Sequence, residues 1–193
     1  MNTRFLTEAD RKEGLLQTLK SNEVSLDIFP YEWLCSTDFF RAPASTQYHA
    51  AYPGGLFDHS VNVLMQLLDM RNKGVTRPWS RPESPFIVGL LHDATKIGLY
   101  VRSQDMNPLT QELDVFYMHN PEAQNFGVHG YDSLCKVEQH MTLTPEEAAC
   151  IRWHMGAYEG PDTWDAYDKA IKEFPNVLWT HTADMVASKL MEV

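Results

Sequence analysis

The chain has 193 residues, 44% of them hydrophobic and 22% charged, which is ordinary for one soluble globular domain. Its three cysteines are odd in number and form no CxxC pair, so we expect neither a disulfide framework nor a cysteine-ligated zinc site. The net charge of −10 and the absence of a Lys/Arg run argue against extensive contact with duplex nucleic acid. No apolar stretch approaches the roughly 20 residues that span a bilayer. We therefore expect a single cytoplasmic domain over residues 1–193 that does not insert into a membrane.

Helical periodicity dominates the first half of the chain. Thr7 is expected to cap a helix that runs to Lys20, and a short helical piece is expected at 31–36. The Pro-, Ala- and Gly-rich segment 41–55 reads as a loop. A long amphipathic helix follows over 56–73, closed by Gly74 at a C′-like position. Ser84-Pro85 then predicts a helix start by the cap-then-proline rule, leading into a fully apolar run.

The second half begins with the one region typical of strands, residues 99–118, where polar and apolar side chains alternate after an expected turn at Asn107-Pro108. A helix is expected around 131–140. Thr144-Pro145-Glu146-Glu147 is a capping box, and its helix should stop at Gly156. Two more helices are expected, around 163–174 and 176–190. The predicted fold class is therefore all-α, a bundle of six or seven helices. A small β-hairpin around 99–118 is compatible with this bundle.

The dipeptide His92-Asp93 ends the most apolar predicted helix. An imidazole and a carboxylate are costly to bury unless a partner neutralises them, and a divalent cation would do so. A local alternative stays open: Asp93 forms an ion pair with Lys96, and His92 simply packs.

His59 lies near the start of the preceding long helix, and Asp184 lies in the apolar last helix. An unpaired Asp is disfavoured in such a segment. Two histidines and two acids, each from a helix expected to face the core, predict a four-ligand site inside the bundle.

Three segments together resemble the HD superfamily of metal-dependent phosphohydrolases, whose pattern is H…HD…D. They are Tyr-His-Ala-Ala-Tyr-Pro-Gly-Gly-Leu-Phe-Asp-His-Ser (48–60), Gly-Leu-Leu-His-Asp-Ala-Thr-Lys-Ile (89–97) and His-x-x-Asp (181–184). The resemblance covers about residues 45–190. It implies an HD-type helical bundle in which a first metal ion is bound by four residues: His59, His92, Asp93 and Asp184.

Some members of that superfamily have two further histidines and a second metal. The matching places here are His129 and His154, and Asp93 would then bridge both ions. Two departures stand out: His154-Met155 replaces a His-His pair, and Thr95 replaces the glycine before the lysine. The alternative is that both histidines only occupy helix ends, where the dipole favours His154.

The resemblance implies a hydrolase that cleaves a phosphomonoester or phosphodiester, most readily of a nucleotide, by attack of a metal-activated water. Asp93 and Lys96 are the expected catalytic residues, and Lys96 and Arg102 are expected to contact the substrate. Lys96 could instead be a solvated surface lysine. The cofactor would be one or two divalent ions, with Mn, Fe, Zn, Ni and Mg all open.

Several weaker features accompany these residues. Arg152 and Lys189 could also contact a phosphate, although isolated basic residues are usually solvated. Pro53-Gly54-Gly55 could offer backbone N–H groups to an anion, but a plain turn is favoured. Tyr158, with Trp153 and Trp164, could stack on a base, but core packing is favoured. His181 could orient a ligand, and His49, His119 and His140 are expected to be non-ligands.

Three other functions remain open at this stage. Certain HD-fold proteins use the same ligand order in a mixed-valence di-iron oxygenase. The 48–60 segment also resembles the HD domain of bacterial 3′–5′ exoribonucleases, a reading that the acidic charge disfavours while leaving nucleic acid open as a substrate. A non-enzymatic module stabilised by its metal is the third. The preferred partner is a small phosphorylated substrate.

Overall fold

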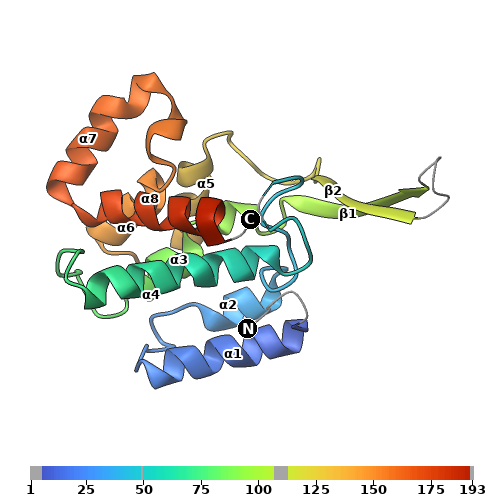
Figure 1. Ribbon diagram of the computed structural model, residues 1–193, viewed down its shortest axis with the longest axis horizontal. Helices are drawn as coiled ribbons and strands as arrows, with labels where there is room; N and C mark the ends of the chain where they lie inside the picture. Colours follow the sequence, from blue (N-terminus) through green and yellow to red (C-terminus); the bar gives the residue numbers. More distant parts are fainter. Residues whose placement is uncertain (1–5, 49, 107–112, 192–193) are drawn as a thin grey trace.

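The structure is a computed structural model that describes residues 6–48, 50–106 and 113–191 (Figure 1). Its helices and strands in chain order are α1 (Glu8–Ser21), α2 (Tyr31–Ser36), α3 (Gly55–Asn72), α4 (Ser84–Leu91), β1 (Tyr100–Met106), β2 (Leu113–His119), α5 (His129–Glu138), α6 (Pro145–Trp153), α7 (Trp164–Glu173) and α8 (Asn176–Val186). A 3-10 turn over Ala94–Lys96 follows α4, and a π-helical turn over Ala187–Met191 follows α8.

The mainly helical prediction is confirmed, with eight α-helices in the described part of the chain rather than six or seven. All eight coincide with segments that the sequence predicts to be helical, including the six-residue α2 and the two helices α7 and α8 on either side of Pro175. The hairpin is also present. β1 and β2 pair antiparallel from Tyr100↔His119 to Met106↔Leu113, and they project away from the helices (Figure 1). The expected turn at Asn107-Pro108 lies outside the described residues.

Local capping signals account for several helix ends. The side chains of Thr7 and Thr144 each accept a hydrogen bond from the backbone three residues on, and both form complete capping boxes. Gly74 has a φ of +69°, as a C′ glycine should. The expected Ser84 cap is wrong: α4 begins at Ser84 itself, and its hydroxyl donates to Glu147 Oε1 at 2.7 Å. The Ser84 hydroxyl therefore binds the buried Glu147 carboxylate, which is distant in the chain, instead of capping the start of α4.

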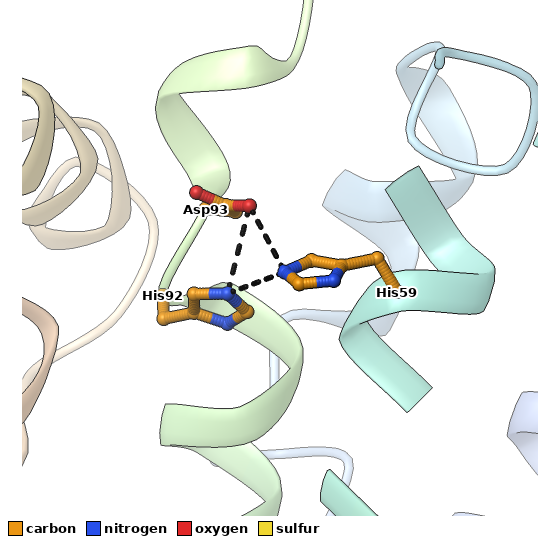
Figure 2. A group of neighbouring side chains, drawn as sticks. All are labelled: His59, His92 and Asp93. Atoms are coloured by element: carbon orange, nitrogen blue, oxygen red, sulfur yellow. Dashed lines mark hydrogen bonds and ion pairs between the residues drawn. The ribbon is translucent and has the colours of Figure 1, made fainter. Parts of the chain in front are cut away.

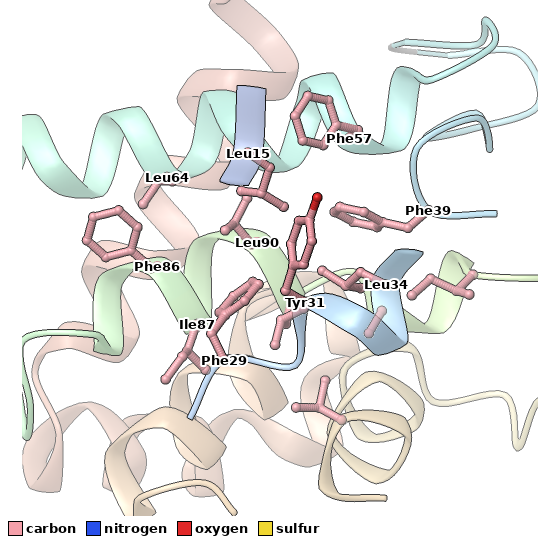
Figure 3. Close-up of a cluster of buried hydrophobic side chains, with 14 of the residues drawn as sticks. Leu15, Phe29, Tyr31, Leu34, Phe39, Phe57, Leu64, Phe86, Ile87 and Leu90 are labelled. Carbon is pink, nitrogen blue, oxygen red and sulfur yellow. The ribbon is translucent and has the colours of Figure 1, made fainter. Parts of the chain in front are cut away.

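The main core lies between α1, α2, α3 and α4 (Figure 3). Its largest fully buried side chains include Phe29, Phe39, Phe86 and Leu64. Helices α3 and α4 pack closely because Gly89 has no side chain: a Cβ there would lie 2.7 Å from the Leu64 Cα. A second apolar cluster joins α3 and α4 to α6 and α8, and α7 packs against it. The α3–α4 pair is thus central, with helices packed on both sides.

Candidate metal centre

The structure brings together all six residues expected to bind metal, each from the end of an element or from a central helix. His59 is in α3, His92 caps the C-terminus of α4 and Asp93 follows it. His129 opens α5, His154 caps the C-terminus of α6, and Asp184 is in α8. His59, His92, Asp93 and His154 are buried. Helix ends therefore converge on a single point beside the central α3–α4 pair.

One group of polar atoms gathers on the α3 side of Asp93 (Figure 2). The Nε2 atoms of His59 and His92 are 3.2 Å apart. Asp93 Oδ2 lies 3.4 Å from the first and 3.5 Å from the second. Asp184 Oδ1 lies 3.3 Å from His59 Nε2. These are the four residues expected to hold the first metal ion.

A second group faces the other oxygen of the same carboxylate. Asp93 Oδ1 is 2.6 Å from His129 Nε2 and 3.5 Å from His154 Nε2. The two oxygens of Asp93 therefore point to different pairs of histidines. A carboxylate in this position can serve two neighbouring ligand sets at once.

Backbone carbonyls orient two of the buried imidazoles. His92 Nδ1 lies 3.0 Å from the Gly89 carbonyl, and His154 Nδ1 lies 2.7 Å from the Ile151 carbonyl. A carbonyl only accepts, so Nδ1 carries the proton and Nε2 presents a lone pair to the centre. This second hydrogen bond is the usual device that fixes a metal-binding histidine.

The donor set fits a divalent ion. Two ligands at about 2.0–2.2 Å from a common ion lie about 3.0–3.5 Å apart at ordinary coordination angles, which matches most distances in the cluster. His154 Nε2 is enclosed and has no hydrogen-bond partner within the described ranges. A buried acceptor of this kind is costly unless something binds it. The buried His/Asp groups could thus hold a metal ion, and imidazole with carboxylate suits several metals.

The protonation states of His92, Asp93 and Asp184 also suit ligation. Burial lowers the pKa of His92 to about 3, so its imidazole is neutral. Burial would raise the pKa of Asp93, but the nearby Lys96 and histidines outweigh it and hold that pKa well below its usual range. Burial would also raise the pKa of Asp184, but the hydrogen bond from His59 and the charge of His92 outweigh burial, and the pKa of Asp184 is lowered. For His154, burial lowers the pKa but the facing Asp93 raises it more. An incoming cation would displace any proton held there.

A pocket of about 300 Å³ opens onto the cluster, because Asp93, His129 and Asp184 are among its lining residues. Two cationic side chains, Lys96 and Lys189, also line it. Lys96 is buried, and its Nζ donates to Asp93 Oδ2 at 2.6 Å. The proposed Asp93–Lys96 ion pair is therefore present even though α4 ends at Leu91, because the 3-10 turn brings Lys96 back to the carboxylate. The pocket is large enough for a small molecule.

Aromatic side chains complete the mouth of this pocket. Tyr100 and the exposed Tyr158 both line it. Trp153 instead packs against the second apolar cluster, and the guanidinium carbon of Arg152 lies 4.0 Å from the centroid of the Trp153 ring. Tyr100 begins β1, and nothing in its sequence context marked it out. Its position comes from the place where the hairpin leaves the bundle.

Arg102 is not brought to the metal centre. It is exposed on β1 and lines another pocket with Arg41 and Tyr117, and that pocket has Tyr100 as a lining residue in common with the main pocket. Arg152 is paired with Glu159 at 2.5 Å. Lys189 lines the main pocket instead, in the π-helical turn that follows α8.

The remaining candidates have ordinary structural roles. The Gly54, Gly55 and Leu56 N–H groups all donate to backbone carbonyls, so the favoured plain turn is observed and no anion site forms there. His140 stacks on Trp33 with ring centroids 4.2 Å apart, and His119 packs against Tyr100. His181 lines the main pocket with its Nδ1 2.8 Å from the His154 carbonyl. His49 lies outside the described residues.

Comparison with known proteins adds no relative. No family model, no curated protein and no solved structure matches this chain. In the described part of the chain, no helix combines the length and apolar character needed to cross a bilayer. The function must therefore be argued from the site itself.

Proposed function

We propose that this protein is a metal-dependent phosphohydrolase that cleaves a phosphomonoester or phosphodiester, with a nucleotide as the preferred substrate class. The observation that carries the proposal is the placement of Asp93, whose two oxygens face separate pairs of imidazoles. The order of the six residues supports it, since it resembles the H…HD…H…H…D pattern of HD phosphohydrolases.

The six residues would share the work of holding the cofactor. His59, His92 and Asp184 lie on one side of Asp93, and His129 and His154 lie on the other. Divalent ions bound there would supply positive charge to a phosphoryl oxygen and acidity to a water molecule. The protein contributes a buried, pre-oriented donor set, so few groups have to reorganise when the cofactor binds.

The cations in the pocket indicate the charge of the substrate. Lys96 is buried beside Asp93, and Lys189 lines the same pocket in a chain whose net charge is −10. A phosphoryl group entering this pocket would meet both ammonium groups, and Lys96 could turn from Asp93 Oδ2 toward a substrate oxygen. Tyr100 and Tyr158 offer faces for a planar base. Arg102 stays a prediction, for a substrate long enough to reach the adjacent pocket.

An oxygenase could use an identical set of histidines and carboxylates, so the ligands alone do not separate the two reactions. Two lysines line the pocket and suit an anionic phosphate ester, which is the substrate class of the proposed hydrolase. Because an oxygenase also binds an organic substrate, oxygen consumption, and not the charge of the pocket, separates the two reactions.

A substrate panel tests the proposal. Wild-type protein with added Mn²⁺ would be assayed on nucleoside mono-, di- and triphosphates, cyclic nucleotides, short RNA and a generic phosphodiester. We expect turnover of at least one nucleotide, and a loss of at least about 100-fold in Asp93→Ala and Asp184→Ala. Asp27→Ala removes an exposed carboxylate far along the chain from the centre and should match wild type.

Two results would overturn the proposal. Turnover that is equal in Asp93→Ala and wild type would place the chemistry elsewhere. No turnover on any substrate, from protein that binds iron and consumes oxygen, would assign the site to an oxygenase instead.

A further inference from the structure

A second pocket lies at the far end of α3, away from the metal centre. It has a volume of about 370 Å³ and is lined by Arg71, Arg77, Trp79 and Arg81 with neighbouring Thr76 and prolines. Arg71 is twelve residues after His59 on the same helix, which corresponds to about 18 Å along the helix axis. This pocket shares no lining residue with the pocket over the metal centre.

The segment that forms this pocket is unusually basic. Residues 71–81 contain Arg71, Lys73, Arg77 and Arg81 and no acidic residue, in a chain with 26 acidic and 16 basic residues. A solvated basic run would spread its side chains over a convex surface. Here three arginines line one concavity, and the two that form no ion pair with a described residue concentrate positive potential there.

Two of these guanidinium groups have no internal role. Arg81 is committed, because it donates to both oxygens of buried Glu147 at 2.8 and 2.7 Å. Lys73 pairs with Asp69 on the exposed face of α3. The side chains of Arg71 and Arg77 make no hydrogen bond or ion pair with any residue that the structure describes. Their donors are therefore available to a ligand.

The loop that carries Arg77 is held rigidly by buried polar groups. Asn176 accepts from the Arg77 N–H at 2.9 Å and donates to the Arg77 carbonyl at 3.1 Å. Glu146 accepts from the Ser80 N–H at 2.7 Å and from its hydroxyl at 2.8 Å. Pro78 and Pro82 restrict the backbone further. A loop ordered before binding loses little entropy when a ligand arrives.

We propose that this pocket binds the phosphate group of a small anionic ligand, independently of the metal centre. Guanidinium groups match phosphate oxygens through paired N–H donors. Trp79 lines the same pocket and offers an aromatic surface beside the charge. The limited size of the pocket favours a small molecule over an extended nucleic acid, which needs a basic stripe along its backbone.

Calorimetric titration of metal-free, full-length protein with inorganic pyrophosphate tests this site. We expect saturable binding of one equivalent in wild type. Arg71→Gln/Arg77→Gln should weaken it at least tenfold. Lys73→Gln, a matched loss of charge outside the pocket, and Lys189→Gln, at the metal-centre pocket, should each change it less than twofold. Thermal melting of every variant checks folding. Arg77→Lys keeps the positive charge but loses the paired N–H donors of the guanidinium, and it should weaken pyrophosphate binding about threefold or more.

Three results would overturn the assignment. One is the absence of pyrophosphate binding to wild-type protein. Another is a loss in Lys73→Gln or Lys189→Gln as large as that in the double arginine variant, which would indicate general charge or the metal-centre pocket. The third is arginine-dependent binding of a single-stranded 12-nucleotide DNA without any binding of pyrophosphate. Because no metal or turnover is involved, these results are separate from the test of hydrolysis.

Discussion

Asp58 and Asp93 are both buried carboxylates, but different partners stabilise them. Asp58 accepts from Arg11 Nε and Nη2, both at 3.1 Å, and from the Tyr52 hydroxyl at 3.1 Å. Asp93 faces Lys96 and four imidazoles, and those imidazoles are themselves candidate metal ligands. Asp58 is thus satisfied within the protein and anchors α1 against the start of α3. Its neighbour in sequence, His59, is left to face the candidate metal centre.

Removing Arg11 should expose the cost of the Asp58 charge. In Arg11→Met the carboxylate stays buried without its cation, and we expect the free energy of unfolding to fall by about 3–5 kcal/mol, measured by urea denaturation. Lys73→Met breaks the exposed Lys73–Asp69 pair and should cost less than about 0.5 kcal/mol. A loss below 1 kcal/mol in Arg11→Met would mean that Asp58 gains access to water, contrary to the packing described.

At the scale of elements, the contact between α3 and α4 positions the residues of the candidate metal centre. His59 is on one of these helices and His92 ends the other, so the distance between their imidazoles depends on how closely the helices pack. Gly89 permits that approach, because any side chain there would meet the α3 backbone at Leu64. The small residue is therefore needed for the geometry of the site as well as for the core.

Gly89→Ala should affect stability and metal binding together. An added methyl group forces the helices apart, so we expect unfolding to become easier by about 1–3 kcal/mol and the affinity for Mn²⁺ to fall, measured by urea denaturation and by metal titration. Gly14→Ala is the matched control, since a Cβ at this position in α1 meets nothing within 4 Å. That change should stabilise by about 0.5–1 kcal/mol. A Gly89→Ala protein with normal stability and affinity would contradict the role given to this contact.

For the whole molecule, the candidate ligands come from positions 59 to 184 and from five helical regions. The unfolded chain has no such site, so a metal ion that binds only the folded state shifts the folding equilibrium. Without an ion, the Lys96–Asp93 ion pair and the histidine hydrogen bonds offset part of the cost of burying these polar groups. Folding and metal binding should consequently be coupled without being inseparable.

Metal loading should raise global stability in a concentration-dependent way. At free Mn²⁺ of about 100 times the dissociation constant, we expect a gain of about 2.7 kcal/mol in the free energy of unfolding, measured by urea denaturation over a series of Mn²⁺ concentrations. Asp93→Ala should abolish the dependence, whereas Asp27→Ala should retain it. An equal response of all three proteins would indicate that Mn²⁺ acts away from this centre.

The sequence by itself determined the helical class, the hairpin region, the Thr7 cap, the Thr144 capping box and the C′ glycine, because each depends on residues close together in the chain. It also singled out His59, His92, Asp93 and Asp184, because ionisable groups in apolar helices require a partner, whereas His129 and His154 were indicated only by the resemblance to the HD pattern. Only the tertiary structure decided that Lys189 rather than Arg102 lines the pocket, that Ser84 serves Glu147 instead of capping α4, and that Arg71 and Arg77 share a concavity. These outcomes depend on contacts between segments that are distant in the chain, and no local pattern encodes them.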